Sequence, residues 1–201
     1  LVNLIARLYD VTDGAVKIFG NDVRDYENAQ LRSTFGVVPQ KAVLFQGSVR
    51  DNVKWGNENA SDEEIIKALK ISQSYDFVFA KKNGLDEEIS QGGKNLSGGQ
   101  RQRLTIARAL VSEPDILILD DSSSALDFAT DAKLRKSLDE LGKSEGLTLI
   151  AVSQRASSVM YSDIIVVMDD GKIEAVGSHD ELMKSSQIYR EIYSSQNKED
   201  I

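Results

Sequence analysis

The sequence predicts an α/β protein in which an open parallel sheet is interrupted by a helical insertion. Two nearly unbroken apolar runs of strand length, residues 116–119 and 147–152, are typical of strands buried on both faces of a parallel sheet. Residues 125–141 lie between these runs and have apolar side chains at helical spacing, so the three segments predict a βαβ unit. Residues 48–110 show a helical pattern with no obvious strand, and they are the predicted insertion.

The elements before the insertion are predicted from apolar spacing and from turn residues. Apolar residues recur at helical spacing over 1–8, so the chain is predicted to open inside an amphipathic helix that has no N-cap residue in front of it. We therefore expect a segment of the protein to precede this helix. Strands are predicted at 15–19 and at 35–38, and the second of these ends at Pro39.

The elements after the βαβ unit are a hairpin and two helices. A strand is predicted at 164–168, and the Asp-Asp-Gly turn at 169–171 leads into a second strand at 172–176. Apolar and aromatic residues near 181–182 and at 189–193 predict two small helices at the end of the chain.

Composition and charge exclude several classes of protein. The chain has 201 residues and no cysteine, which excludes disulfides and thiol chemistry. His179 is the single histidine, so a mechanism or a zinc site that needs two imidazoles is excluded as well. With 24 Lys and Arg against 32 Asp and Glu, the net charge of −8 argues against nucleic acid as a partner. The sequence also lacks an apolar run of about 18 residues, the length expected of a membrane-spanning helix.

Two adjacent carboxylates, Asp120 and Asp121, follow the predicted strand at 116–119. In an open α/β sheet ligands bind at the carboxyl ends of the strands, so a metal ion or a phosphate ester is the expected ligand there. The alternative is that the two acids only cap the next helix, and for an isolated pair of aspartates both interpretations are equally open.

A glycine-rich segment precedes the helix predicted at 100–110, and it consists of Leu96, Ser97, Gly98, Gly99 and Gln100. Glycine lets an anion approach the main chain, the serine offers a hydroxyl group, and the positive end of the helix dipole favours negative charge. We therefore expect phosphate oxygens to bind here. The alternative, an ordinary glycine loop that leads into a helix, is less favoured because of the neighbouring residues.

Together these segments resemble the nucleotide-binding domain of ATP-binding cassette (ABC) transporters. The resemblance rests on the order and spacing of several motifs, and it covers essentially the whole chain. The motifs are Gln40 and residues 44–53, 96–103, 106–110, 116–121, 124–127 and 177–182. Residues 45–52 look more like the exporter branch of the family than like importer ATPases.

The resemblance implies a RecA-like P-loop NTPase core with an inserted helical subdomain. Residues 1–47 and 112–201 are then parts of the core, and residues 48–111 form the helical subdomain that carries the signature motif. The P-loop pattern G-x-x-x-x-G-K-[ST] (Walker A) and the N-terminal strands of the core are missing, although residues 1–5 look like the helix that follows the P-loop. We expect the chain to bind ATP weakly without that segment.

ATP and Mg²⁺ are the ligands that the resemblance implies. Asp120 corresponds to the Walker B aspartate that holds Mg²⁺, and Gln40 to the Q-loop glutamine that reaches the same ion and the attacking water. The residues implied in nucleotide binding are Ser97, Gly98, Gly99 and Gln100 of the signature motif, Gln40, and Asp127 of the D-loop. In this family the signature motif contacts the γ-phosphate of ATP bound to the opposite subunit, so each nucleotide lies between two domains.

Two catalytic positions depart from the family pattern. Asp121 stands where active members have Glu, which shortens the expected base by one methylene group, and Gln154 stands where a switch histidine is expected. Glutamine can donate a hydrogen bond to a γ-phosphate but cannot titrate. We hypothesise that Asp121 and Gln154 belong to a degenerate site in a heterodimeric exporter, whose partner's site is completed by the intact signature motif. A slow homodimeric ATPase is the less favoured alternative.

The implied partners are a second nucleotide-binding domain and the transmembrane domain of a transporter, at the cytoplasmic face of the cell membrane. A non-transport ABC ATPase acting on DNA or ribosomes is a second hypothesis, and a regulatory nucleotide-binding module is a third. Tyr9 and Trp55 are interpreted as core or subdomain contacts. Arg101 and Arg103 are interpreted as exposed helix arginines that pair with acids as readily as with phosphate.

Overall fold

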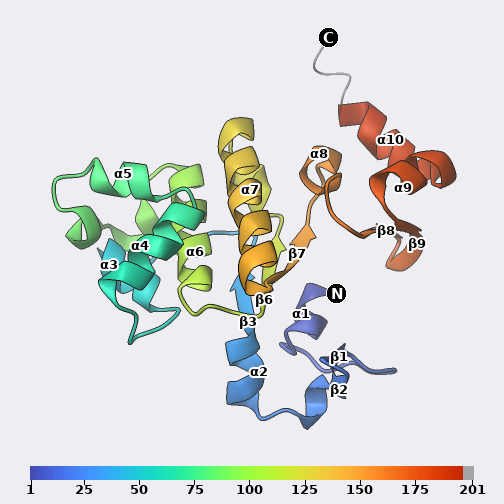
Figure 1. The fold of residues 1–201 in the computed structure, drawn as a ribbon, viewed down its shortest axis with the longest axis horizontal. Coiled ribbons are helices and arrows are strands. Elements are labelled where there is room, and N and C mark those ends of the chain that lie inside the picture. The colour runs from blue at the N-terminus through green and yellow to red at the C-terminus, as the bar shows by residue number, and fades with distance from the viewer. Residues whose placement is uncertain (197–201) are drawn as a thin grey trace. The chain divides into compact units, whose positions relative to one another are not determined.

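The computed structural model describes residues 1–196, and the chain forms two compact units, Leu1–Val152 and Ser153–Ile201 (Figure 1). The first unit contains a parallel sheet and the predicted helical insertion. The second unit, as far as residue 196, contains a β-hairpin and short helices.

A parallel sheet forms the centre of the first unit. Its strands are β3 (Phe35–Val38), β6 (Ile116–Asp120) and β7 (Thr148–Val152), hydrogen-bonded in the order β3-β6-β7. Helix α7 (Phe128–Glu145) connects β6 to β7, which confirms the predicted βαβ unit. Strand β6 is buried on both faces, but Val152 of β7 is 42% exposed. The predicted burial of β7 on both faces is wrong, because its side chains are exposed or half-buried along the whole strand. Among the described strands, β7 also lies at the edge of the sheet and pairs with β6 alone.

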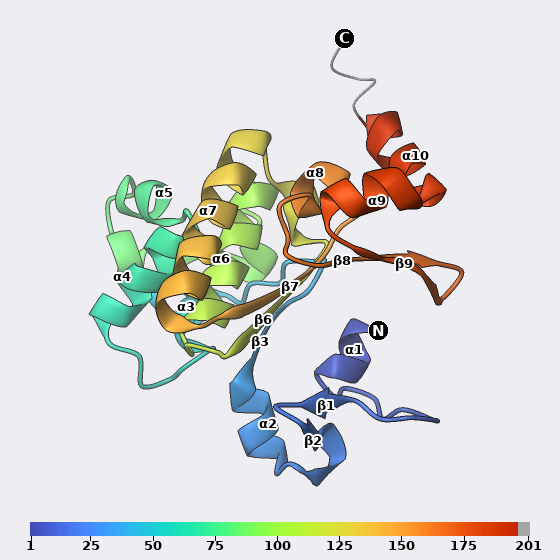
Figure 2. The same ribbon diagram turned by 45° about the vertical axis from the view of Figure 1, so that its right-hand side comes forward.

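The insertion predicted at 48–110 is helical, with one correction. Its helices are α3 (Val49–Lys54), α4 (Asp62–Ile71), α5 (Tyr75–Phe79) and α6 (Gly98–Leu110). A short antiparallel pair, β4 (Gly47–Ser48) and β5 (Glu88–Ile89), also lies in this region, so the prediction of no strand was wrong. Such short strands are missed because they carry no alternating pattern. Helix α6 packs against α3, α4 and β3, and Figures 1 and 2 show these helices beside the sheet.

Several single turns of 3₁₀ helix connect these elements. They are Val23–Asp25, Gly84–Asp86, Gln91–Gly93 and Ser122–Ala125. The largest group of buried side chains joins the insertion to the sheet, and it includes Ile65, Leu104 and Leu117. This shared core holds the helical insertion against the strands that carry the candidate site.

The N-terminal part of the first unit forms shorter elements than predicted. They are α1 (Val2–Ile5), β1 (Lys17–Ile18), β2 (Asn21–Asp22) and α2 (Asn28–Thr34). The helix predicted over 1–8 ends early, and Arg7 has a positive φ of 49° that a helix cannot accommodate. The strand predicted at 15–19 is shortened because Phe19 and Gly20, with φ of 50° and 84°, turn the chain into β2.

The second unit contains the predicted hairpin and C-terminal helices. Its elements are α8 (Ala156–Val159), β8 (Ile165–Asp169), β9 (Lys172–Gly177), α9 (His179–Ser185) and α10 (Gln187–Gln196). The turn between the strands is where the sequence predicts it, with φ of 44° at Asp170 and 74° at Gly171. A glycine after an aspartate with positive φ is typical of a tight hairpin turn.

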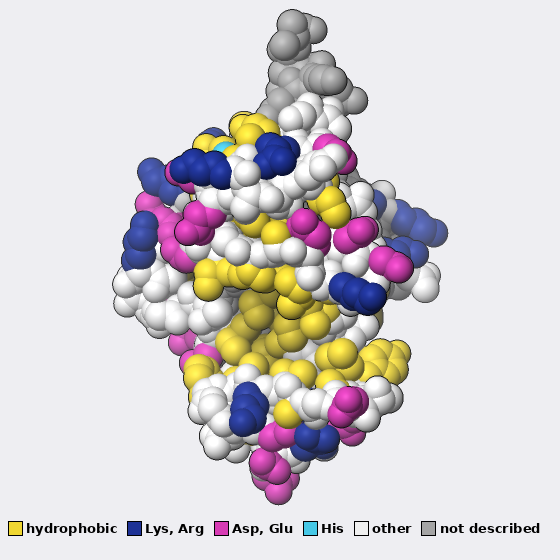
Figure 3. Space-filling view, turned by 90° about the vertical axis from the view of Figure 1, so that its right-hand side faces the viewer, with side chains coloured by type: hydrophobic (Ala, Val, Ile, Leu, Met, Phe, Trp, Pro, Cys, Tyr) yellow, Lys and Arg dark blue, Asp and Glu magenta, His cyan; other side chains and the backbone are white. Residues whose placement is uncertain are grey.

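The two faces of this hairpin differ, because alternate side chains of a strand point in opposite directions. On one face Ile165 and Val167 form a small core with Leu182 and Tyr189. The other face carries exposed apolar side chains, namely Val166, Met168, Ile173 and Val176. Figure 3 shows a continuous area of exposed hydrophobic side chains on one face of the molecule.

Candidate functional site

The carboxyl ends of the parallel strands define the candidate site. Asp120 is the last residue of β6 and lies in register with Val152 of β7. Asp121 follows in a left-handed conformation, with φ of 46° and ψ of 32°, and its backbone N–H donates to the carbonyl oxygen of Val152 at 2.9 Å. This conformation is uncommon for residues with a side chain, although aspartate tolerates it better than most. The chain therefore turns sharply as it leaves the sheet.

Gln40 meets Asp121 at this edge of the sheet. Strands β3 and β6 are parallel neighbours in which Val38 lies beside Leu119, so residues that follow them come together. The side-chain amide of Gln40 donates a hydrogen bond of 3.0 Å to Oδ2 of Asp121. The structure thus brings Gln40, Asp120 and Asp121 to one place.

The glycine-rich segment forms the N-terminus of helix α6. Ser97 is the N-cap and makes a reciprocal capping box: its Oγ accepts from the backbone N–H of Gln100 at 3.2 Å, and its own N–H donates to Oε1 of Gln100 at 2.9 Å. The helix therefore begins at Gly98, two residues before the predicted start. The amides of Gly98 and Gly99 lie in the first turn and have no acceptor within the helix. Gly98 is exposed, and a Cβ atom at this position would meet nothing closer than Nη2 of Arg101, at 3.9 Å, so the main chain here is open to an approaching anion.

Gly99 brings the signature segment against the predicted D-loop. A Cβ atom at this position would lie 3.1 Å from the carbonyl oxygen of Ala125, which is tighter than ordinary contact. Asp127, at the end of the D-loop, caps helix α7 by accepting from the backbone N–H of Thr130 at 2.9 Å. That backbone hydrogen bond lowers the pKa of the Asp127 carboxyl group. Asp127 therefore has a structural role in this chain in addition to the role implied by the resemblance.

Within residues 1–196, Arg101 and Arg103 form hydrogen bonds to backbone oxygens and not the expected ion pairs with acids. Nη1 of Arg101 donates to the carbonyl oxygens of Leu96 at 2.6 Å and Gly93 at 3.3 Å. Arg103 donates to the carbonyl oxygen of Gln73, and burial lowers the pKa of its guanidinium group. Both arginines thus connect neighbouring loops to α6 by hydrogen bonds. The helix is packed inside the insertion, so backbone carbonyl oxygens lie closer to these side chains than carboxylates do.

Gln102 is a polar contact of α6 that was not predicted. Its side chain is 1% exposed, and its Nε2 atom donates to the carbonyl oxygen of Pro39 at 3.3 Å. The signal in the sequence was a polar residue on an apolar helix face, since Ile106 and Ala109 follow it at helical spacing and are buried. Buried polar side chains are normally paired, so this position pointed to a specific acceptor.

Gln154 and His179 belong to the second unit. The backbone carbonyl of Gln154 accepts a 2.6 Å hydrogen bond from Nε2 of Gln196. His179 is the first residue of α9, and its Nδ1 atom lies 2.8 Å from the hydroxyl group of Tyr189. His179 therefore contributes to the packing of the C-terminal helices.

The two aromatic residues considered for core contacts are exposed. Tyr9 is 68% exposed, so it is not a core residue. Trp55 is 66% exposed but stacks on Phe45 with ring centroids 4.4 Å apart. Trp55 therefore makes a contact within the insertion through one face of its ring, while most of its side chain is exposed.

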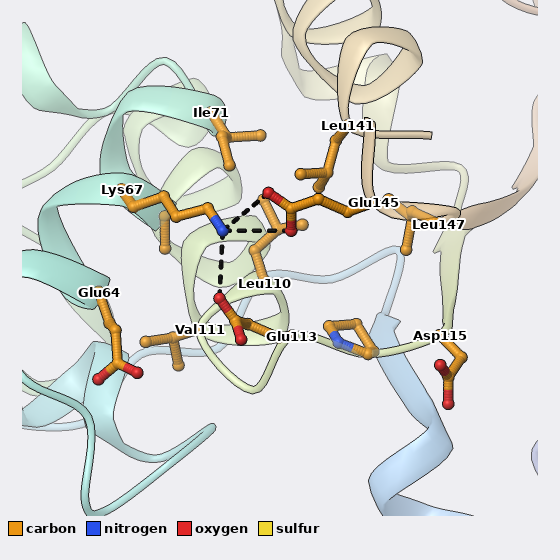
Figure 4. A pocket seen from close by; sticks show the side chains of 12 residues that line it. Glu64, Lys67, Ile71, Leu110, Val111, Glu113, Asp115, Leu141, Glu145 and Leu147 are labelled. Atoms are coloured by element: carbon orange, nitrogen blue, oxygen red, sulfur yellow. Dashed lines mark hydrogen bonds and ion pairs between the residues drawn. The ribbon is translucent and has the colours of Figure 1, made fainter. Parts of the chain in front are cut away.

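A cavity of about 80 Å³ lies away from these residues, lined by α4, the end of α6 and α7 (Figure 4). Lys67 extends across it and pairs with Glu145 at 3.0 Å and Glu113 at 3.1 Å. The hydrogen bonds to Glu145 and Glu113 raise the pKa of Lys67. The cavity contains none of the candidate site residues, so we interpret it as a packing gap bridged by ion pairs.

The side chains at the strand ends fit a magnesium ion. Mg²⁺ prefers hard oxygen ligands and usually binds one or two carboxylates together with substrate phosphates and water. Asp120, Asp121 and Gln40 offer such oxygens. Within residues 1–196 no cluster of three or more His, Cys, Asp or Glu side chains could hold a metal alone. A metal here would therefore need phosphate oxygens or water to complete its ligands.

A parallel sheet with carboxylates at its strand ends, together with a helix whose first turn contains two glycines, is typical of nucleotide-binding proteins. The sequence profile described as ABC transporter matches residues 1–124. The chain therefore belongs to the ABC transporter family. Its α/β fold is that of an ABC ATPase of the P-loop NTPase class, which confirms the predicted fold class.

Individual relatives are similar over nearly the whole chain. The chain is 43% identical over 196 residues to the uncharacterized ABC transporter ATP-binding protein YfiB of Bacillus subtilis (strain 168), a match that covers 98% of the chain and 34% of the relative. It is 40% identical over 197 residues to a "Putative multidrug export ATP-binding/permease protein" of Staphylococcus aureus (strain Mu50 / ATCC 700699), with the same coverage of 98% and 34%.

A solved structure is similar in fold. A chain of the "Structure of a bacterial Atm1-family ABC exporter with ATP bound" superposes with a TM-score of 0.92 at 34% sequence identity, over 97% of this chain and 34% of that chain. This chain thus spans about a third of the length of the proteins it matches. In residues 1–196 no helix has the length and apolar character needed to cross a membrane.

Proposed function

We propose that this chain is the ATP-binding part of an ABC exporter, in which ATP binding and hydrolysis are coupled to export of a substrate across a membrane. The observation that carries the proposal is the hydrogen bond between Gln40 and Asp121, because it gathers beside Asp120 the side chains that metal and water binding require. The names of the staphylococcal relative and of the solved exporter support transport as the task.

In this proposal Asp120 and Gln40 hold Mg²⁺, which when bound neutralises charge on phosphate oxygens. Asp121 accepts a hydrogen bond from Gln40 through Oδ2, and its second oxygen can accept one from a water molecule. Because aspartate is one methylene group shorter than glutamate, that oxygen is held back from the water. A displacement of about 1 Å can reduce a reaction rate on the order of 100-fold.

The signature residues act, in this proposal, on a nucleotide held by a second ATP-binding domain. The amides of Gly98 and Gly99 and the hydroxyl group of Ser97 offer donors at the open end of α6. Gly99 contacts the D-loop, so both motifs would meet the partner together. The proposed division of labour assigns the signature motif to the helical subdomain 48–111, and the metal-binding residues to the core segments 1–47 and 112–201.

We further propose that the chain's own site is degenerate and that the exporter is a heterodimer. Asp121 and Gln154 replace the two expected catalytic residues, whereas the capping box that shapes the signature motif is complete. A chain with these features would hold ATP with little turnover and would complete the partner's site. A slow homodimer remains the competing proposal.

The partner that spans the membrane would dock, in this proposal, beside the Phe45–Trp55 stack. These rings are 41% and 66% exposed, and large exposed apolar side chains mark interaction sites. Arg108 braces this surface, because its Nη1 atom donates to the carbonyl oxygen of Val43 at 2.9 Å and its guanidinium lies 5.1 Å from the Phe45 ring centroid. We propose from the family membership that the domain then lies at the cytoplasmic face of the membrane. The net charge of −8 disfavours the alternative of a non-transport ABC ATPase acting on nucleic acid.

ATP hydrolysis by the full-length protein, alone and mixed with a candidate second subunit, tests this proposal. We expect Mg²⁺-dependent hydrolysis that is faster in the mixture, and we expect Gln40→Ala to raise the Mg²⁺ concentration needed for half-maximal hydrolysis. Gln30→Ala, which changes an exposed glutamine on α2, is the matched control and should leave hydrolysis unchanged. If the protein alone hydrolyses ATP as fast as the mixture, the heterodimer is excluded. If neither preparation binds ATP, the proposed function is wrong.

A further inference from the structure

Gln102 connects two segments of the chain that have separate roles in the proposed site. It lies in the middle of α6, whose N-terminus is the signature motif, and it donates to the carbonyl oxygen of Pro39 across 63 residues of sequence. Its side chain is 1% exposed. A buried amide group without a partner is costly, so this contact determines where the side chain lies.

The acceptor, the carbonyl oxygen of Pro39, lies directly before Gln40, and its orientation affects the direction in which the chain leaves β3. The ring of Pro39 restricts its φ to about −65°, so ψ of Pro39 is the one soft torsion between the end of β3 and the next peptide. That torsion sets the direction of the Pro39 carbonyl group. The peptide that joins Pro39 to Gln40 is planar, so a hydrogen bond on this carbonyl also orients the backbone of Gln40.

Helix α6 holds Gln102 in a fixed position relative to Pro39, because it packs directly on β3. A Cβ atom at Gly36 of β3 would lie 2.8 Å from the carbonyl oxygen of Ala109 and 2.9 Å from Cγ of Pro114. Only a glycine allows this close approach of helix and strand. Helix α6, the end of β3 and the Pro39 carbonyl group are therefore held together. Gln40 follows Pro39 directly and donates its hydrogen bond to Asp121.

We propose that Gln102 is a positioning residue that holds Gln40 beside Asp121 by fixing the Pro39 carbonyl group, and thereby makes the Q-loop follow the signature helix. A displacement of α6 by a nucleotide at the signature motif is then transmitted to Gln40 through this hydrogen bond, in addition to the packing of α6 on β3. This inference deepens the proposed function and rests on it only where ATP is concerned.

The first test measures backbone hydrogen exchange in the full-length protein without nucleotide. Gln102→Met keeps the length of the side chain but removes the donor. Within residues 40–46 the amide of Phe45 is protected by a 2.9 Å hydrogen bond to Oδ1 of Asn52, and we expect exchange there to rise about fivefold, as for the loss of one hydrogen bond. Thr105→Val is the matched control. Thr105 is 4% exposed on the same helix, and its hydroxyl donates to the carbonyl oxygen of Arg101 at 3.0 Å, so exchange in 40–46 should not change. Equal exchange in wild type and Gln102→Met overturns the proposal.

A second variant separates the hydrogen bond from packing. Gln102→Glu keeps the shape of the side chain, and a buried carboxyl group has a raised pKa, so its protonated form can donate to the Pro39 carbonyl oxygen. We expect its exchange in 40–46, relative to wild type at the same pH, to return toward normal as the pH is lowered. The Gln102→Met variant should show no such recovery. A recovery that is equal in both variants contradicts the proposal.

The third test asks whether Gln102 acts through Gln40. The Mg²⁺ concentration that half-maximally supports ATP binding is measured for wild type, Gln102→Met, Gln40→Ala and the double variant. We expect Gln102→Met to raise it about fivefold in the wild-type background and to have no further effect in Gln40→Ala. Independent, multiplying effects mean that Gln102 does not act through Gln40, and overturn the proposal. If wild type itself does not bind ATP, the proposed function fails, while the exchange experiments still decide the role of Gln102.

Discussion

The side-chain amide of Gln40 and the carboxylate of Asp121 are joined by a 3.0 Å hydrogen bond across 81 residues of sequence. The contact exists because β3 and β6 are parallel neighbours whose carboxyl ends reach the same edge of the sheet. Between the two residues the chain forms the whole helical insertion and then returns to the sheet as β6. The link between the predicted Q-loop and Walker B residues is therefore a product of sheet topology.

Lengthening the side chain at Asp121 should increase ATP turnover. Asp121→Glu in the full-length protein, measured together with its partner, should raise hydrolysis by up to about 100-fold, because the carboxylate then reaches the water position. Asp121→Asn, which has the original length and no charge, is the control and should not raise it. An unchanged rate in Asp121→Glu would show that reach at this position does not limit turnover.

Removal of the Ser97 hydroxyl group should have two separable effects. Ser97→Ala removes the cap of α6 and should lower the free energy of unfolding by about 1 kcal/mol. Ser61→Ala removes an equivalent capping box on α4 and should cost a similar amount. ATP turnover by the assembled exporter should fall about tenfold or more in Ser97→Ala alone, since a donor to phosphate is lost. Equal turnover in the two variants would contradict the role proposed for the signature motif.

Two neighbouring glycines should respond oppositely to alanine. At Gly98 the added methyl group meets nothing within 3.4 Å, so Gly98→Ala should stabilise the fold by about 0.4–1 kcal/mol through the unfolded state. At Gly99 the methyl group would lie 3.1 Å from the carbonyl oxygen of Ala125, so that gain should be cancelled or reversed. Chemical denaturation of both variants measures the difference. Equal stabilisation by Gly98→Ala and Gly99→Ala would show that the D-loop shifts to accommodate the added methyl group at little cost.

The ion pairs of Lys67 should stabilise the fold in a defined pH range. The hydrogen bonds to Glu145 and Glu113 raise the pKa of Lys67, so its contribution is complete below the unfolded-state pKa of about 10.4 and is lost as the pH rises through the folded-state pKa. The side chain is 44% exposed, so Lys67→Met should cost less than about 1 kcal/mol at pH 7. Urea unfolding at pH 7 and above pH 10.4 tests this, and the difference from wild type should shrink at the higher pH.

Lys136→Met is the control for this measurement. Lys136 is 77% exposed and lies 3.9 Å from Glu140, so its removal should change the stability less than Lys67→Met does at pH 7. A difference for Lys67→Met that persists unchanged at high pH would mean that its packing, and not its charge, stabilises the fold.

Prediction from sequence succeeded where a local pattern was long or unambiguous. The strand at 35–38 has the predicted bounds, and the βαβ unit and the hairpin turn at 169–171 are confirmed. The prediction that β7 is buried was wrong, because an apolar run shows only that a strand could be buried. It does not show whether neighbouring elements cover the strand. The helix over 1–8 was predicted too long because the left-handed turn at Arg7 has no signal in the spacing of apolar residues.

The amino-acid order alone was enough to indicate the αβ class, the family and the residue types of the candidate site, because these depend on periodicity and on motif spacing along the chain. Folding in three dimensions decided that Gln40 meets Asp121, that Gly99 touches the D-loop, and that Gln102 binds the Pro39 carbonyl group. Such contacts arise from the parallel pairing of distant strands and from the close approach of a helix to a strand. No local pattern encodes which distant atoms will lie within hydrogen-bonding distance of one another.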